Sequence, residues 1–159
     1  MKTMQEWLDK YAESHQNSTN KALHWICVPA IFFSVLGLLW SLPAAFLQEL
    51  LPFMGIYANF ATLFVFLCAL FYLRLSIPIC LGMLFIASTF LWICGYVSAH
   101  FSTPLWQISL AIFALAWVGQ FIGHKIEGAK PSFFEDLQFL LIGPAWLLSF
   151  VYRHLGIKF

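Results

Sequence analysis

Long apolar runs with almost no charge constrain this sequence more than any other feature. Four of them, residues 23–42, 58–75, 77–101 and 105–123, are each close to the ~20 residues that a helix needs to cross a bilayer. Only 9% of the residues are charged and 62% are hydrophobic, whereas about 25% are charged in typical soluble domains. A segment in lipid must satisfy its own backbone hydrogen bonds, so each run is expected to be a helix. The sequence predicts an all-α, polytopic membrane bundle with about four transmembrane helices.

Two further segments flank the predicted spans. Residues 1–19 form a predicted amphipathic helix on the membrane or on the bundle, because their apolar positions follow the i, i+3, i+4, i+7 pattern: Met4, Trp7, Leu8 and Tyr11. Residues 137–152 are apolar but short, and Gly143 and Pro144 interrupt them. A re-entrant hairpin is favoured there over a fifth span. No repeat or second domain is visible, so residues 1–159 are predicted to form a single integral membrane domain.

Lysine and arginine occur at alternate ends of the predicted spans. They precede the first span, end the second and follow the fourth, while the connections after the first and third contain none. The positive-inside rule then predicts a cytoplasmic N-terminus, in the inner membrane of a bacterium or the endoplasmic reticulum of a eukaryote. His15, His24 and His124 would all lie at cytoplasmic ends, and His100 at the other. The net charge of +1 excludes the basic footprint of a nucleic-acid partner.

These three histidines form a candidate metal site on the cytoplasmic side. Imidazole at the end of a membrane helix costs free energy unless it is paired, protonated or bound to a metal. For any one of them a hydrogen bond to a backbone carbonyl is the simpler interpretation, but three that converge favour a metal. Imidazoles that leave open positions suit iron(II), and zinc also fits these residue types. The break HQNSTN between His15 and His24 lets the N-terminal segment fold back over the first span.

A polar stripe ends the fourth span, where Gln120, His124 and Glu127 share one helix face. Glu127 could ligate the metal, hold a histidine ring, or simply pair with Lys125 or Lys130 in solvent. Gln120 could donate a hydrogen bond to a bound oxygen or satisfy a neighbouring helix. Both are candidate catalytic residues.

Other residues have two interpretations each. Asn20 is expected to cap the helix of the first span and is a candidate catalytic residue. Tyr11 is a further candidate, although an interfacial aromatic is the simpler interpretation. Gly119 and Gly123 form a GxxxG pattern, which predicts close helix packing or a homo-oligomer contact. His154 is expected to belong to the basic tail, or to be a further ligand if the last segment folds back.

Two motifs occur together in this chain. The first, YxxxHxxxxNxxxHxxxxP, runs from Tyr11 to Pro29, and the second, QFxGHxxE, runs from Gln120 to Glu127 and is followed by Pro131. In combination they resemble the fungal 2-hydroxy fatty acid dioxygenase family, a membrane family with bacterial members. The resemblance implies an iron(II)-dependent enzyme of fatty acid α-oxidation that converts a 2-hydroxy fatty acid and O2 to a fatty acid one carbon shorter. It also gives the role of the family's conserved histidines to His15, His24 and His124.

The chemistry of such a substrate agrees with these residue types. A 2-hydroxy acid offers iron a carboxylate and a hydroxyl oxygen, three imidazoles leave room for oxygen beside it, and a bundle rich in Phe and Leu can hold the tail. Two alternatives remain open. One is a small transporter or proton relay that uses the Gln120, His124 and Glu127 stripe, although polarity is concentrated at one end of the chain. The other is a non-catalytic assembly factor that packs through Gly119 and Gly123.

Overall fold

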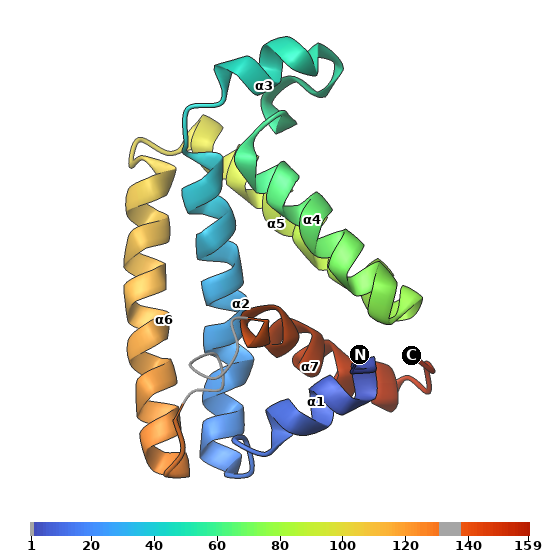
Figure 1. The fold of residues 1–159 in the computed structure, drawn as a ribbon. Coiled ribbons are helices and arrows are strands. Elements are labelled where there is room, and N and C mark those ends of the chain that lie inside the picture. Colours follow the sequence, from blue (N-terminus) through green and yellow to red (C-terminus); the bar gives the residue numbers. More distant parts are fainter. Residues whose placement is uncertain (1, 131–137) are drawn as a thin grey trace.

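The computed structural model describes residues 2–130 and 138–159, and the regular elements in these ranges are all helices (Figure 1). The predicted all-α fold is therefore confirmed. In chain order the elements are α1 (Met4–Ala12), α2 (Ser18–Trp40), α3 (Ala45–Leu50), the 3-10 helix η1 (Pro52–Tyr57), α4 (Phe60–Leu75), α5 (Ile77–His100), α6 (Leu105–Glu127) and α7 (Phe139–His154).

Three of the described helices, α2, α5 and α6, are long and apolar enough to cross a membrane. The second predicted span corresponds to α4, which has 16 residues and extends only about 24 Å, less than the ~30 Å of a hydrocarbon core. Capping explains this length: Asn59 accepts a hydrogen bond from Thr62 N at the start of α4, and Ser76 ends α4 and caps α5 through Ile79 N. The segment predicted as a span at residues 58–75 is thus a helix, but the helix begins two residues later, at Phe60, and is shorter than the hydrocarbon core is thick.

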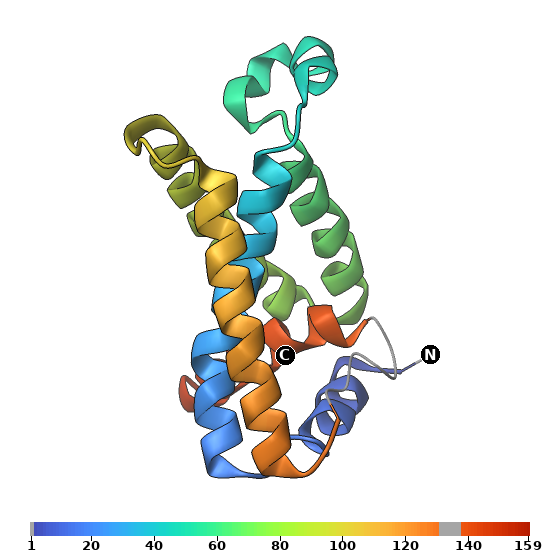
Figure 2. The same cartoon turned by 90° about the vertical axis from the view of Figure 1, so that its left-hand side faces the viewer.

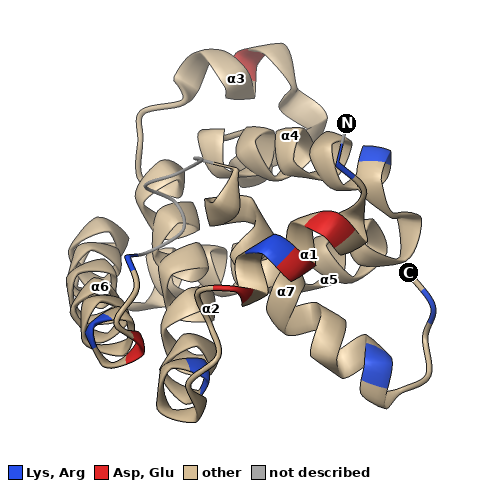
Figure 3. Cartoon of the chain, turned by 60° about the horizontal axis from the view of Figure 1, so that its bottom comes forward, with Lys and Arg blue, Asp and Glu red and all other residues tan. Residues whose placement is uncertain are grey.

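The helices form two pairs and a transverse layer. In Figures 1 and 2, α2 and α6 run side by side in opposite directions, and α4 and α5 form a second pair inclined to the first. Helices α1 and α7 pack on one another across one end, and α3 with η1 lies at the other. Among the described residues, charged side chains gather at the end that carries α1 and α7, apart from an acidic residue on α3 (Figure 3).

The apolar face of α1 is buried, as its pattern predicted. Met4, Trp7, Leu8 and Tyr11 are all buried, and they contact α7. The ring of Trp7 meets that of Phe139 edge to face at 5.3 Å between centroids. The helix therefore lies on the bundle, where it packs against α7.

The last apolar segment is one continuous helix in its described part, Phe139–His154, so the hairpin predicted for residues 137–152 is wrong. Pro144 lies in the second turn of α7, and the helix continues past it. Gly143 has a packing role instead of a turn role, because an added Cβ would lie 3.0 Å from the hydroxyl oxygen of Tyr11. The glycine lets α1 approach α7 closely.

The GxxxG residues of α6 face α2 in the same chain. A Cβ added to Gly119 would lie 2.6 Å from Cys27 Sγ, and one added to Gly123 would collide with Asn20 Oδ1. The predicted close helix packing is therefore observed, but within the chain. Gly123 is buried and Gly119 half-buried against α2, and the homo-oligomer contact through these two residues stays a prediction.

Candidate metal centre

Three buried histidines meet where α1, α2 and α6 come together. His15 lies in the turn between α1 and α2, His24 on α2 and His124 on α6, and their exposed fractions are 1%, 0% and 5%. Ring centroids are 4.3 Å apart for His15 and His24, and 5.0 Å apart for each pair with His124. One ring nitrogen from each lies within 4.8 Å of the others, so the three could hold a metal ion. The predicted convergence of the chain's two ends is confirmed.

A short turn reverses the chain between His15 and His24. The backbone N of His15 donates to Ala12 O at 3.0 Å and closes the last turn of α1. Asn17 then caps α2, since its Oδ1 accepts from the backbone N of Thr19 at 2.9 Å and of Asn20 at 3.3 Å. The prediction that Asn20 caps this helix is wrong. It lies in the first turn of α2, where its side chain is buried against α6.

Hydrogen bonds to the backbone determine which ring nitrogens carry protons. His15 Nδ1 lies 2.7 Å from Tyr11 O, and His24 Nδ1 lies 2.9 Å from Asn20 O. A carbonyl can only accept, so both Nδ1 atoms are protonated and in neutral rings both Nε2 atoms carry lone pairs. These two Nε2 atoms face one another at 2.9 Å, a separation that requires a proton or a cation between them.

The surroundings disfavour the proton. Burial, and then the neighbouring His24 ring, lowers the pKa of His15 to about 3. Nδ1 of His124 is also buried and has no hydrogen-bond partner among the described residues. A buried polar atom without a partner costs about 1–3 kcal/mol. A metal ion accepts lone pairs from several imidazoles at once, so the donor set of this centre fits one.

Glu127 connects the end of α6 to the turn that carries His15. Its carboxylate accepts hydrogen bonds from Gln16 N at 2.7 Å, Asn17 N at 2.9 Å and Asn20 Nδ2 at 2.9 Å. Gly128, with φ of +75°, ends α6 directly after it. The carboxylate lies outside the group of candidate ligands and forms no ion pair with the described lysines. The hydrogen bonds to the turn therefore differ from all three sequence-based interpretations, in which Glu127 is a metal ligand, holds a histidine ring, or pairs with Lys125 or Lys130.

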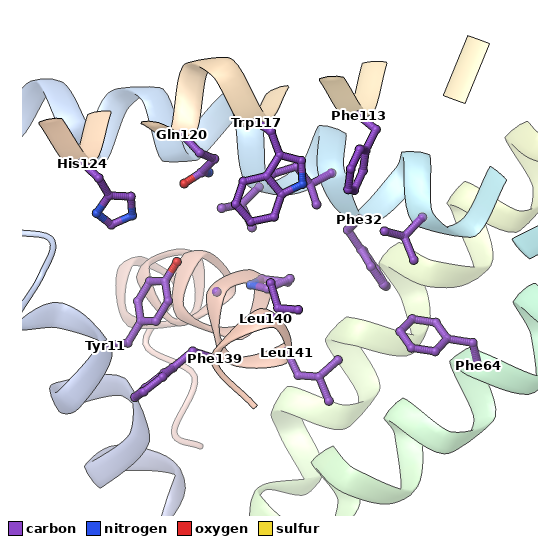
Figure 4. Close-up of a pocket in the computed structure, with 15 residues that line it drawn as sticks. Tyr11, Phe32, Phe64, Phe113, Trp117, Gln120, His124, Phe139, Leu140 and Leu141 are labelled. Carbon is purple, nitrogen blue, oxygen red and sulfur yellow. The ribbon is translucent and has the colours of Figure 1, made fainter. Parts of the chain in front are cut away.

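An apolar cavity of about 280 Å³ begins beside this centre (Figure 4). Tyr11, Gln120 and His124 line its first part, and all three are at least nine-tenths buried. Tyr11 stacks on the His15 ring at 4.1 Å and 11°, and burial raises the pKa of Tyr11 well above its ordinary value. Gln120 Nε2 has no hydrogen-bond partner among the described residues. The cavity thus pairs polar groups at one end with apolar walls.

Most of the residues in these walls were not predicted from the sequence. Phe113 and Trp117 line the cavity, and they precede Gln120 and His124 on one stripe of α6. Their spacing of three and four residues was the available signal. The apolar wall continues with residues from α2, α4 and α7: Val28, Ile31, Phe32, Val35, Phe64, Phe139, Leu140, Leu141, Gly143 and Pro144.

The remaining histidines lie away from the centre. His100 is exposed at the opposite end of α5, where its Nδ1 lies 2.9 Å from Tyr96 O. His154 is exposed at the end of α7, so the alternative in which it is a further ligand is not supported. Pro131, the last residue of the second motif, falls outside the described residues.

Fold and site together define a small polytopic membrane protein with a candidate three-histidine metal centre at the head of an apolar cavity. Residues 1–155 match the family model described as 2-hydroxy-palmitic acid dioxygenase Mpo1-like, and the chain therefore belongs to the Mpo1-like family. This match confirms the resemblance given by the paired motifs. Comparison with curated proteins and with solved structures gave no match.

Proposed function

We propose that this protein is an iron(II)-dependent dioxygenase that converts a 2-hydroxy fatty acid and O2 to a fatty acid one carbon shorter. The observation that carries the proposal is the pair of Nε2 atoms of His15 and His24, 2.9 Å apart, whose protons are held at Nδ1 by backbone carbonyls. Because the lone pairs of the two Nε2 atoms face one another, a cation can bind both. The family description supplies the reaction class, and the apolar cavity suits a fatty acyl tail.

The choice of iron follows from the donor set and the reaction. Imidazoles from His15, His24 and His124 would hold the ion and leave positions open, and iron(II) in such a site supplies activation of O2 beside a chelating substrate. In the balanced reaction, the 2-hydroxy acid and one O2 give the shortened acid, CO2 and water. The bond between C1 and C2 breaks, and the oxidation of these two carbons provides all the electrons that O2 accepts. No outside reductant is required.

The protein's own residues would bind the substrate and exclude water. Gln120 Nε2, buried and without a partner, is placed to donate to the carboxylate or hydroxyl oxygen of the substrate. The Tyr11 hydroxyl stays protonated and lies at the same end of the cavity, where it can donate as well. Phe139 and Trp117 complete a wall that keeps bulk water from the reacting carbons. Glu127 and Asn20 hold the turn that presents His15.

The two alternative functions have less support. A proton relay through Gln120, His124 and Glu127 needs polar groups that continue across the membrane, but beyond Gln120 the cavity walls are apolar. The Glu127 carboxylate is moreover occupied by donors from the turn. An assembly factor that packs through Gly119 and Gly123 would need a face that α2 already covers.

The test combines metal analysis with oxygen consumption. Protein purified without chelator is expected to contain iron and to consume O2 with 2-hydroxypalmitate, one O2 for each shortened acid and without added reductant. His15→Ala, His24→Ala and His124→Ala should each lose bound iron and activity.

His100→Ala is the matched control, because His100 has the same Nδ1 contact with the carbonyl four residues before it, and stacks on Tyr96 at 4.3 Å. It should keep both iron and activity. Wild-type protein that remains inert after reconstitution with iron would overturn the proposal.

A further inference from the structure

We infer that the cavity measures the length of the acyl chain, and that Phe32, Phe64 and Phe113 at its far end set the longest tail that fits. The inference rests on the proposed function for the identity of the ligand, a 2-hydroxy fatty acid. It adds residues that determine specificity at a distance from the metal centre.

The cavity follows two antiparallel helices over the same distance. On α6 the lining residues are Phe113, Trp117, Gln120 and His124, which fall within about 60° of one another at 100° per residue. Phe113 lies eleven residues before His124, and on α2 the lining residue Val35 lies eleven residues after His24. Eleven residues correspond to about 16 Å along a helix. The cavity lining on α2 and the lining on α6 therefore extend over the same length, from the candidate ligands to the cavity's far end.

Three phenylalanines from three helices line that end. Phe113 comes from α6, Phe32 from α2 and Phe64 from α4, and in Figure 4 they lie together on the side away from His124. Phe32 also packs against α5, since its ring centroid lies 5.9 Å from that of Phe90. A tail that enters from the candidate metal centre would therefore meet these aromatic rings at the far end.

The length of the cavity corresponds to a definite number of carbons. An extended chain advances about 1.25 Å per methylene, from C–C bonds of about 1.5 Å at tetrahedral angles. A distance of ~16 Å then holds about 13 methylenes. With C1 and C2 at the metal centre, the longest acid that fits has about 14 to 16 carbons.

Binding measurements on the iron-free, full-length protein test this length. A series of saturated 2-hydroxy acids, shorter and longer than this limit, can be titrated in detergent while the fluorescence of the protein, which has Trp117 in the cavity wall, is followed. Affinity, expressed against the concentration of free acid in water after correction for uptake by the detergent, should rise about fourfold for each added methylene, the ratio that corresponds to about 0.8 kcal/mol per buried CH2. The rise should stop when the tail reaches the three phenylalanines. A rise that continues unchanged past this length would overturn the inference.

The break in the series is the chain length at which the rise in affinity stops. Variants at the far end of the cavity should move this break. Phe113→Ala opens up to one further helical turn, so the break should shift to acids longer by up to about four carbons. Val35→Phe fills the same end and should shift it to shorter acids. Phe66→Ala is the matched control, because Phe66 is 58% exposed on α4 and does not line the cavity. If Phe113→Ala fails to fold, Val35→Phe and Phe64→Leu still test the inference, with opposite expected shifts.

The outcomes separate this inference from the proposed function. If the break moves with Phe113→Ala and Val35→Phe but the protein consumes no O2 after iron is restored, the inference about chain length is supported and the proposed dioxygenase function is overturned. If these variants consume O2 but their break stays at the wild-type chain length, the proposed dioxygenase function is supported and the inference about chain length is overturned.

Discussion

Substitution of Glu127 by Gln tests whether this carboxylate stabilises the proposed metal centre without being one of its ligands. The change keeps the length of the side chain and removes the charge. In the structure both carboxylate oxygens accept: Oε1 from Gln16 N, and Oε2 from Asn17 N and Asn20 Nδ2. The two backbone donors precede the first turn of α2, where the helix dipole also favours a negative charge. A glutamine offers one acceptor oxygen, and its amide group would face a donor.

The magnitude follows from these contacts. A hydrogen bond to a charged group contributes about 1.5–3 kcal/mol, against about 0.5–1.5 kcal/mol for a neutral one. The substitution thus costs roughly 1 kcal/mol for each of the three donors before screening. Glu127 is partly exposed, so solvent screening reduces the total to about 2 kcal/mol. If the metal-bound state needs the turn in place, this corresponds to at most about 30-fold weaker metal binding, reached when the turn is displaced in the metal-free variant.

The assay is competition for iron(II) against a chelator of known affinity, with wild-type protein, Glu127→Gln and Glu13→Gln. Glu13 is the control, because it is an exposed carboxylate close to the same turn whose ion pair with Lys10, at 2.7 Å, lies on the surface. It should leave metal affinity within about twofold. Activity of Glu127→Gln at saturating iron should stay close to that of wild type, because Glu127 contacts the turn after His15 and does not line the cavity. Unchanged metal affinity in Glu127→Gln would refute the reasoning.

Three further predictions follow from other contacts. Gln120→Leu should raise KM for 2-hydroxy acids about fivefold to tenfold, for the loss of about 1 kcal/mol in one hydrogen bond, and leave the iron content unchanged; an unaltered KM would remove Gln120 from the substrate site. Because burial and the His24 ring lower the pKa of His15 to about 3, the unfolded chain binds more protons below about pH 6.5, so thermal unfolding of the metal-free protein should occur at lower temperature as the pH falls from 7 to 5, and less so in His15→Asn. Gly123→Ala should cost about 1–3 kcal/mol of stability in detergent, and Asn20→Ala should relieve most of that loss, because the added Cβ would meet Asn20 Oδ1.

The convergence of the histidines could be predicted because each step depended on local pattern. The spacing of Met4, Trp7, Leu8 and Tyr11 indicates a helix with one buried face, and HQNSTN cannot continue it. Once the chain turns back there, His15 must return toward the start of α2. The position of His124 followed from the length of the apolar run before it and from the positive-inside rule.

The cap of α2 could not be predicted in the same way. Asn17 and Asn20 are the same residue type, three positions apart, and either can accept from a helix N-terminus. The choice depends on Glu127, more than one hundred positions away, which binds the Asn20 amide and the backbone N of Asn17. A cap that depends on a residue so distant in the sequence cannot be predicted from the residues around it.

Gly143 and Pro144 were misinterpreted for a related reason. A Gly-Pro pair in a short apolar segment is typical of a turn, and only the position of the Tyr11 hydroxyl against Gly143 shows that the glycine serves packing. Likewise α4 begins at Phe60, two residues after the predicted start at position 58, because Asn59 caps it, whereas its end at Leu75 is as predicted. Hydropathy reports which segments avoid water, and caps and contacts determine where each helix stops.

The pattern YxxxH occurs twice in this chain and shows what local sequence contributes to the site. Tyr11 with His15, and Tyr96 with His100, form the same structure: the rings stack at 4.1 and 4.3 Å, and Nδ1 of each histidine lies 2.7 or 2.9 Å from the tyrosine carbonyl. In both, Nδ1 is protonated and Nε2 is left as the lone-pair donor. His100 is nevertheless exposed, and the group of candidate ligands in the described residues does not include it.

The local pattern therefore prepares a ligand but does not make a site. At His15 the other requirements come from elsewhere in the chain: α2 brings the Nε2 of His24 to 2.9 Å, α6 brings His124, and α7 supplies Trp146 against the His15 ring at 5.3 Å. Burial by these helices removes the water that would otherwise solvate the lone pairs, so a cation becomes the favourable partner. The difference between the two histidines is one of tertiary structure, and for this reason His100→Ala is the control that separates loss of a ring from loss of a centre.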